Sequence, residues 1–138
     1  MLTHFVIYGL LGMLIEVFWT GLGSLLAGNL SLTSRTYIWM FFIYGSAVFL
    51  EPIHDIIRRE NIILRGIAWA IIILLIEFVS GYILDLTIGV CPWDYSKSSK
   101  YSILGYIRLD YFPAWFFAGL LFERVHDLLD KKLDRLIH

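Results

Sequence analysis

The stretch GIAWAIIILLIEFVSGYILDLTIGV, residues 66–90, decides the fold. A helix needs about 20 predominantly apolar residues to cross the hydrocarbon core of a bilayer. This stretch exceeds that length, and the only charged residues inside it are Glu77 and Asp85. Three more stretches of the same type occupy about 5–26, 37–57 and 110–129. The pattern predicts an all-α integral membrane protein with four transmembrane helices, in a single domain over residues 1–138.

The composition agrees with a membrane protein. Hydrophobic residues make up 59% of the chain, against about 45–50% in soluble proteins. The formal net charge of −1 provides no basic field, so nucleic acid is not an expected partner. We expect membrane lipids around the chain and a homodimer or larger membrane complex, because four helices enclose little volume. The first apolar stretch begins almost at Met1 with no basic region before it, which favours a retained span over a signal peptide.

The distribution of Lys and Arg predicts how the chain is oriented in the membrane. Seven of these residues fall on the side that holds both termini and the second loop, and four fall on the other side. The excess predicts that both termini are cytoplasmic. The expected location is the cell (inner) membrane.

The chain also contains two pairs of similar segments. LIEVF at 14–18 resembles LIEFV at 75–79, and EPIHD at 51–55 resembles ERVHD at 123–127. The similarity predicts two pseudo-repeated helical hairpins, related by an axis along the membrane normal as in transporters with parallel repeats. Chance similarity between apolar helices is the alternative interpretation.

Each expected span carries one glutamate: Glu16, Glu51, Glu77 and Glu123. An acid in the hydrocarbon core costs about 2.5–3.5 kcal/mol on insertion scales, so it needs a partner or a purpose. No Lys or Arg lies within the spans of Glu16 and Glu77, which we expect to form a central site for a cation, a proton or a positively charged substrate. Glu51 and Glu123 lie nearer the cytoplasmic ends and would line the approach to it.

Two less specific interpretations of the acids stay open. Burial raises the pKa of a carboxyl group, so Glu16 and Glu77 could be neutral and hydrogen-bonded to Thr20, Ser80 or a tyrosine. They would then hold helices together without transporting any ion or substrate. Glu51 and Glu123 could form structural pairs with Arg58 and a nearby basic residue.

A metal site is a further possibility. Glu on two helices and Glu-x-x-His on two others is the ligand set of di-iron carboxylate proteins. Here it would offer Glu51, His54, Glu123 and His126 to a divalent metal ion. These histidines sit where a helix meets the headgroups, so solvated helix ends are the plainer interpretation.

The third loop contains the run CPWDYS, residues 91–96. Trp93 and Tyr95 suit anchors at the membrane interface, and Asp94 suits a turn cap. Their density in one short run also suits a lid over the mouth of the bundle, where they would help to bind a substrate or cation. The single cysteine, Cys91, excludes an internal disulfide.

With these residues in place, the chain resembles the transmembrane protein 229 family, within the CmpB-like group labelled "putative ABC-transporter type IV". The resemblance covers about residues 8–126, and its specific part is the run at 91–96. It implies that the four glutamates and the Trp-Asp-Tyr-Ser run belong to the family pattern. His54 and His126 do not match the eukaryotic relatives. The residues that carry the resemblance are Gly12, Glu16, Phe42 to Gly45, Glu51, Glu77, Gly81, Cys91 to Ser96, Gly105, Leu109, Tyr111, Pro113, Trp115 and Glu123.

The expected function is transport-related, with the intramembrane carboxylates as the binding site. The alternatives are a structural or accessory subunit of a membrane complex and a metal-dependent intramembrane enzyme acting on lipid. An enzyme is less favoured because no nucleophile motif is present. The sequence has no G-x-x-x-x-G-K-[ST] phosphate loop, so another polypeptide would have to supply any ATP.

Overall fold

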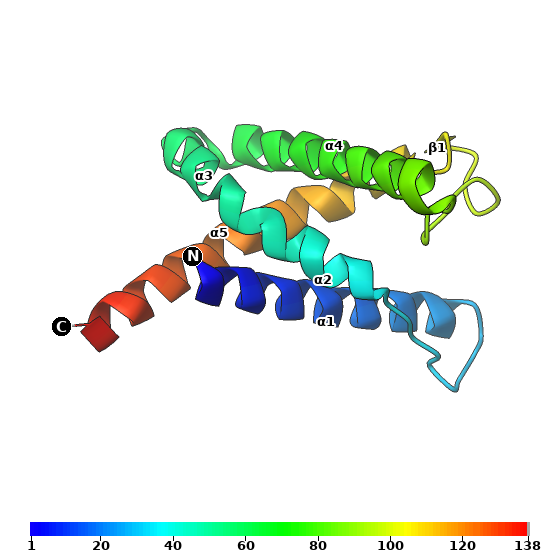
Figure 1. Ribbon diagram of the computed structural model, residues 1–138, viewed down its shortest axis with the longest axis horizontal. Coiled ribbons are helices and arrows are strands. Elements are labelled where there is room, and N and C mark those ends of the chain that lie inside the picture. The colour runs from blue at the N-terminus through cyan, green and yellow to red at the C-terminus, as the bar shows by residue number, and fades with distance from the viewer. Residues whose placement is uncertain (138) are drawn as a thin grey trace. The chain divides into compact units, whose positions relative to one another are not determined.

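The computed structural model describes the chain from Met1 to Ile137 and its side chains as far as Lys132. It is mostly helical and divides into two compact units, Met1–Pro52 and the part from Ile53 onward. Figure 1 shows that each unit contains a long helix with a second helix beside it, blue with cyan in the first unit and green with orange in the second. Each unit is described by itself below.

The first unit is a helical hairpin. Its long helix is α1, Leu2–Leu26. The second helix of the hairpin is α2, Ile38–Gly45, which is followed by the 3₁₀ segment η1, Ser46–Leu50. The helix α3, Glu51–Ile57, continues the same run across the boundary between the units. The run is interrupted because Pro52 has no N–H to donate into the preceding turn.

Glycines let the two helices of the first hairpin approach closely. A Cβ added at Gly12 would lie 2.1 Å from Cγ of Tyr44, and one at Gly9 would lie 2.7 Å from the ring of Phe41. At Gly45 the glycine belongs to α2 and the ring belongs to α1, because Phe5 occupies the space beside Gly45. Small residues that admit a large ring from the other helix are the usual means of helix association in a membrane.

The second unit holds the longest helix. This helix, α4, covers Ile62–Ile88; the side chain of Asn61 caps its start by accepting from Leu64 N at 3.0 Å. Gly89 ends it in the left-handed conformation, with φ of 74°, which glycine adopts without strain. The chain then forms a two-stranded antiparallel ribbon and a 3₁₀ turn before its last helix. These elements are β1, Ser102–Ile103; β2, Ile107–Arg108; η2, Leu109–Tyr111; and α5, Phe112–Ile137.

The helices α4 and α5 pack in the same manner as those of the first unit. A Cβ added at Gly119 would lie 2.1 Å from Cβ of Trp69, and one at Gly66 would lie 2.2 Å from the ring of Phe116. Trp69 is fully buried in this contact. Large apolar side chains such as Phe18 and Phe117 are exposed instead, as expected of residues that face lipid.

Within the described residues, three helical segments are long and apolar enough to cross a membrane: Leu2–Leu26, Ile38–Ile57 and Ile62–Ile88. They correspond to the first three predicted spans, with ends shifted by a few residues. The fourth predicted span falls on α5, which is less apolar overall because its second half is rich in charged residues. A fourth span, the repeat and the cytoplasmic termini stay predictions.

Candidate functional site

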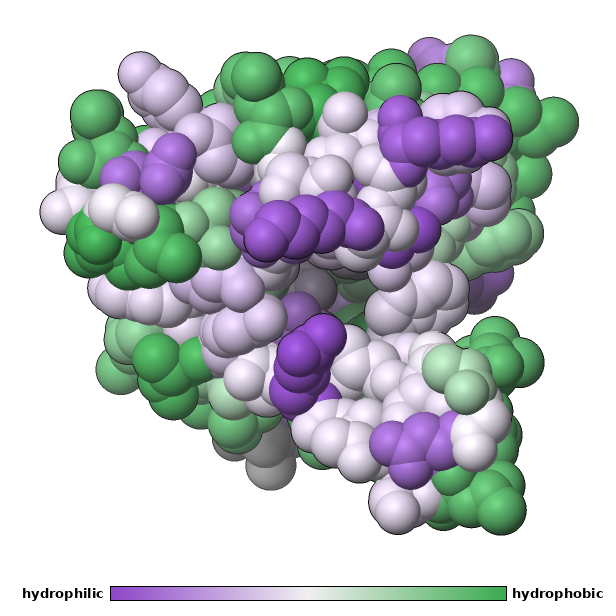
Figure 2. All heavy atoms as spheres, turned by 90° about the vertical axis from the view of Figure 1, so that its right-hand side faces the viewer, coloured by the Kyte–Doolittle hydropathy of each residue, from purple (hydrophilic) through white to green (hydrophobic). Residues whose placement is uncertain are grey.

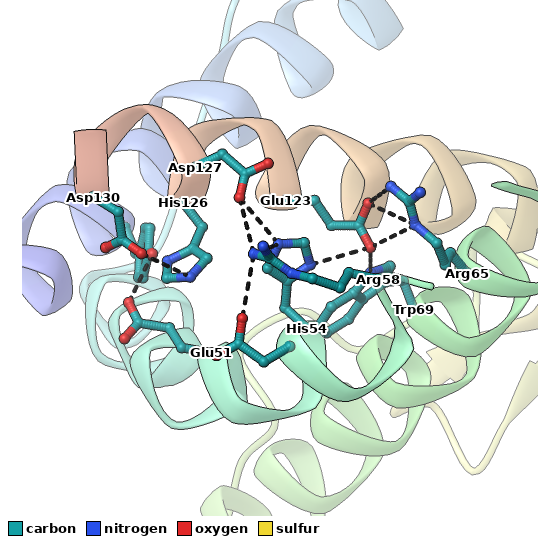
Figure 3. Close-up of polar contacts among 11 residues, drawn as sticks. Glu51, His54, Arg58, Arg65, Trp69, Glu123, His126, Asp127 and Asp130 are labelled. Carbon is teal, nitrogen blue, oxygen red and sulfur yellow. Dashed lines mark hydrogen bonds and ion pairs between the residues drawn. The ribbon is translucent and has the colours of Figure 1, made fainter. Parts of the chain in front are cut away.

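Glu123, on α5, is the most completely buried acid in the described part of the second unit, with 1% of its surface exposed. Arg65 Nε donates to both carboxylate oxygens at 3.1 Å, and Arg65 Nη2 also contacts Oε2. Trp69 Nε1 donates to Oε1 at 2.8 Å (Figure 3). Arg65 and Trp69 are one helical turn apart on α4, so both reach the same carboxylate. The result is a buried ion pair with an additional hydrogen bond.

His54, on α3, extends this pair toward the surface. Its Nδ1 lies 3.4 Å from Glu123 Oε1, and its Nε2 lies 3.2 Å from Asp127 Oδ1. Asp127 is partly exposed and also forms an ion pair with Arg58 at 3.2 Å. The ring of His126 stands perpendicular to that of His54, with centroids 5.2 Å apart. A connected polar cluster therefore runs from the buried Glu123 to the partly exposed Asp127 (Figure 3).

Glu51, in the first unit, is held by two residues of α1. His4 Nδ1 lies 2.5 Å from Glu51 Oε1, and the Tyr8 hydroxyl donates to the same oxygen at 2.8 Å. His4 and Tyr8 are one helical turn apart, like Arg65 and Trp69. They also precede Glu16 by the same spacings by which Arg65 and Trp69 precede Glu77.

Glu16 lies near the midpoint of α1 and is contacted by the loop that follows this helix. Thr36 Oγ1 donates to Glu16 Oε2 at 2.5 Å. The loop is fixed beside the helix because Arg35 N donates to Thr20 Oγ1 at 3.0 Å, while Thr20 Oγ1 lies within donating distance of Arg35 O at 2.9 Å. An extended segment therefore folds back along α1 to reach its middle.

Glu77 lies near the midpoint of α4, is buried and has an equivalent contact. The Tyr95 hydroxyl, from the loop after this helix, donates to Glu77 Oε1 at 2.8 Å. The backbone of Tyr95 is fixed by a hydrogen bond from its N–H to Gly105 O at 2.8 Å. In both hairpins, then, the acid at the middle of the long helix accepts a hydrogen bond from a hydroxyl of the connecting loop.

The remaining residues of this loop are tied to one another and to α4. Trp93 is buried, and its Nε1 donates to Tyr106 O at 3.0 Å. The Tyr106 hydroxyl donates to Asp85 Oδ2 at 2.6 Å, which raises the pKa of Tyr106 to about 12. Asp94 accepts from Ser96 N at 2.8 Å and from Ser96 Oγ at 3.0 Å, and these bonds hold the pKa of Asp94 below its usual value. Asp94 thus caps a turn, as one of the two interpretations of the sequence expects.

Arg108, in β2, is held over aromatic rings at the base of the loop. Its guanidinium carbon lies 4.1 Å from the ring centre of Tyr111 and 5.8 Å from that of Tyr95. Arg108 Nη2 also pairs with Asp110 Oδ2 at 2.6 Å. Stacking of this kind helps to hold the rings of Tyr111 and Tyr95 in place.

Five partners of the glutamates were not predicted from the sequence. Thr36 lay in an expected loop, and His4 and Arg65 lay just outside the expected spans; Tyr8 and Trp69 looked like ordinary apolar-face residues. The suggested pairing of Glu51 and Glu123 with Arg58 and a nearby basic residue is confirmed in part. Arg65 pairs with Glu123, whereas Arg58 pairs with Asp55 and Asp127. The i, i+4 spacing of His4 with Tyr8 and of Arg65 with Trp69 is the signal that could have found four of the five.

The suggested metal ligands are divided between the two units. Glu51 belongs to the first unit and contacts His4 and Tyr8 there. His54, Glu123 and His126 lie together in the second, where Arg65 already provides a cation for Glu123. A metal site built on all four residues stays a prediction.

Comparison with known proteins identifies the family of this chain. No solved structure matches the chain. The family model described as "Putative ABC-transporter type IV" matches residues 3–137, nearly the whole chain. The long apolar helices agree with a membrane-protein family of this type. The chain is an integral membrane protein that belongs to the CmpB-type family of putative ABC-transporter type IV proteins.

Proposed function

We propose that this protein is a small transport-related membrane component in which Glu16 and Glu77 bind a proton, a small cation or a positively charged substrate. The observation that carries the proposal is shared by the two acids. Each lies near the middle of a long apolar helix that has no Lys or Arg in the predicted span around it. Each accepts a hydrogen bond from a hydroxyl of the connecting loop, Thr36 or Tyr95.

The other two glutamates have different roles in this proposal. Glu123 is a structural residue, because the guanidinium of Arg65 neutralises it with two-pronged geometry. Glu51 is contacted by the imidazole of His4 and the phenol of Tyr8, so its contacts differ in chemistry from those of Glu123. Both remain on the expected cytoplasmic approach. Trp93, Asp94 and Tyr95 shape the opposite mouth, with Tyr95 in direct contact with Glu77.

The finer features follow from the sequence patterns. α5 is the fourth span, both termini are cytoplasmic, and the location is the cell (inner) membrane. The chain acts as a homodimer or within a larger complex, and the loop run at 91–96 places it near the transmembrane protein 229 family. An ATP-hydrolysing partner, if the family name reflects the mechanism, would be a separate polypeptide.

A structural or accessory subunit is the second candidate. It is favoured by one observation: each of the four glutamates accepts or shares a hydrogen bond within its own unit, as interhelical or loop-to-helix connections would. In that case the acids hold each hairpin together, and no cation passes. A metal-dependent enzyme using His54 and His126 is the third, and elemental analysis of the purified protein for iron, zinc or manganese tests it.

Flux measurements in liposomes separate the first two candidates. The purified protein is reconstituted, and proton and alkali-cation fluxes are followed for the wild type, Glu16→Gln and Glu77→Gln. Glu60→Gln is the matched control, because this glutamate lies exposed in the turn between α3 and α4. We expect flux or cation binding in the wild type and the control, and its loss in both test variants.

Two results would contradict the proposal. One is the absence of flux and of cation binding in a folded wild-type protein. The other is unchanged flux in Glu16→Gln and Glu77→Gln. A loss of thermal stability in these variants with no flux in any of them would favour the accessory subunit.

A further inference from the structure

A cleft of about 300 Å³ opens where α4 meets the loop that follows it. Its lining includes Asp85 from α4, Cys91 and Asp94 from the start of the loop, and Leu104 and Tyr106 from the ribbon. Figure 2 looks onto the end of the molecule that carries this loop and shows hydrophilic side chains exposed there. The cleft lies entirely within the second unit.

The charge of the cleft is negative. Asp85 and Asp94 both line it, and no Lys or Arg is among its lining residues. Asp94 is ionised at neutral pH, because two hydrogen bonds from Ser96 lower its pKa. A cleft walled by acids raises the local concentration of cations and lowers that of anions.

One face of α4 carries both Asp85, which lines the cleft, and Glu77, which lies deeper along the helix. Asp85, Gly81 and Glu77 follow one another at four-residue intervals, so they lie along one side of the helix, about 12 Å from end to end. Gly81 lies between the two acids, and Tyr106 and Cys91 of the loop fill the space beside it, so the path is closed while the loop is in this position. A Cβ there would meet Cβ of Tyr106 at 3.2 Å and Sγ of Cys91 at 3.3 Å.

Two tyrosine hydroxyls stand at the ends of this path. The Tyr106 hydroxyl donates to Asp85 at the outer end, and the Tyr95 hydroxyl donates to Glu77 at the inner end. Both tyrosines belong to the loop. A movement of the loop would therefore release both acids at once, whereas the helix itself need not move.

The physics of the bilayer also bears on the loop. Between Glu77 and Ile88, α4 is contacted by the loop residues Cys91, Tyr95 and Tyr106. Glu77 lies near the middle of α4, so a hydroxyl that reaches it brings non-helical chain toward membrane depth. Such chain is tolerated where it is buried in protein or lines a water-filled cavity.

From these observations we infer that the cleft is a water-filled entry, open to the loop side of the membrane, through which a proton or small cation reaches Glu77 past the hydroxyl of Tyr95. The inference rests on the proposed function, and it adds the route and the side of entry. It assigns Asp85 and Asp94 the role of attracting the cation. Tyr95 is the gate.

Thiol accessibility tests the route without any measurement of flux. In a Cys91→Ser background, Asp85→Cys is compared with Leu86→Cys, its neighbour on α4. The two positions share one depth, but Leu86 is 73% exposed and does not line the cleft, so it faces lipid in the membrane. Each variant is treated in proteoliposomes with a membrane-impermeant cationic thiosulfonate and with an anionic one, and its fold is checked by gel filtration.

We expect the cationic reagent to modify position 85 at least about tenfold faster than position 86, because the reactive thiolate forms only where water reaches it. The anionic reagent should modify position 85 more slowly than the cationic one, since Asp94 remains in the cleft. Equal rates at the two positions, whether both fast or both slow, would overturn the inference.

The two proposals fail in different ways. Fast modification at position 85 without any proton or cation flux in the wild type leaves the aqueous entry standing and contradicts the proposed function. Flux that depends on Glu77 together with an unreactive position 85 retains the proposed function and rules out this route.

Discussion

The two hairpins use the same connections with different chemistry. In the first, His4 and Tyr8 hold Glu51; in the second, Arg65 and Trp69 hold Glu123. The positions are equivalent, because both pairs sit one turn apart and at the same spacing before the mid-helix glutamate. Arginine is always protonated in proteins, whereas imidazole also exists in a neutral form. The second hairpin therefore has a permanent ion pair where the first has contacts from an imidazole and a phenol.

The connecting loops differ in length but make the same contact. Thr36 belongs to a short extended segment, and Tyr95 to a longer loop that contains a ribbon. The short segment needs only a small hydroxyl because its backbone lies beside α1, where Thr20 fixes it. The longer loop makes the contact with the hydroxyl of a tyrosine. Equal contacts made by unlike loops indicate that the contact itself is what both hairpins require.

The largest difference between the hairpins should appear when the partner of the second-helix glutamate is removed. Arg65→Met should destabilise the protein by about 3–5 kcal/mol, because it leaves Glu123 buried without a cation. His4→Met should cost less, about 1–3 kcal/mol, the cost of an unsatisfied hydrogen-bonding group. Thermal and SDS-induced unfolding of the purified protein measure both.

A rescue sharpens this test. Glu123→Gln added to Arg65→Met should recover part of the lost stability, because the buried charge is then gone. If His4→Met proves as costly as Arg65→Met, the two contacts are energetically equivalent and the comparison between them is wrong.

Close packing is the next largest effect, and here the hairpins should behave alike. Gly12→Ala and Gly119→Ala should each cost about 1–3 kcal/mol, because the new Cβ would lie 2.1 Å from Tyr44 or Trp69. Gly23→Ala is the matched control, since nothing lies within 4 Å of a Cβ at that position. Unfolding midpoints that are the same for Gly23→Ala and Gly12→Ala would show that the helices do not meet at Gly12.

Removing the hydrogen bonds between the loops and the mid-helix glutamates should change the free energy of unfolding by a smaller amount. Thr36→Val and Tyr95→Phe each remove one hydroxyl with little change of shape, so each should lower the free energy of unfolding by about 0.5–1.5 kcal/mol. Limited proteolysis should cut the corresponding loop faster in each variant. A variant in which cleavage stays slow while stability falls would place the lost interaction outside the loop.

The smallest effect concerns the pH dependence of Cys91, which lies in the connecting loop of the second hairpin. Burial raises the pKa of the Cys91 thiol, so its thiolate forms at a higher pH than that of an exposed cysteine. Alkylation of Cys91 should therefore reach half of its maximal rate at a higher pH than alkylation of Leu104→Cys in a Cys91→Ser background. Coinciding pH profiles would show that the thiol is not shielded by the loop.

Much of the fold could be predicted because it depends on local patterns. Apolar length located α1, α4 and the run from Ile38 to Ile57 within a few residues. The similar segments around Glu16 and Glu77 both lie near the middle of a long helix, and the repeat itself remains a prediction. α5 was harder to assign, since its charged second half obscures where a span would end.

The contacts of the acids could not be predicted in the same way. Each one joins residues far apart in the sequence, as Arg65 and Glu123 are, and depends on which faces of two helices meet. The roles of Thr36 and Tyr95 were harder still to predict, because the positions of these residues depend on how a loop folds back along a helix. Sequence patterns identified the acids, but packing selects their partners.

The 3₁₀ segment from Ser46 to Leu50 has a geometric consequence for Glu51. A 3₁₀ helix advances about 2.0 Å and turns about 120° per residue, whereas an α-helix advances about 1.5 Å and turns about 100°. Rewinding these five residues as α-helix would turn Glu51 by about 100° relative to Tyr44 and draw it about 2.5 Å closer along the axis. Such a turn would swing the carboxylate away from His4 and Tyr8, so the winding of one short segment sets the aim of an acid.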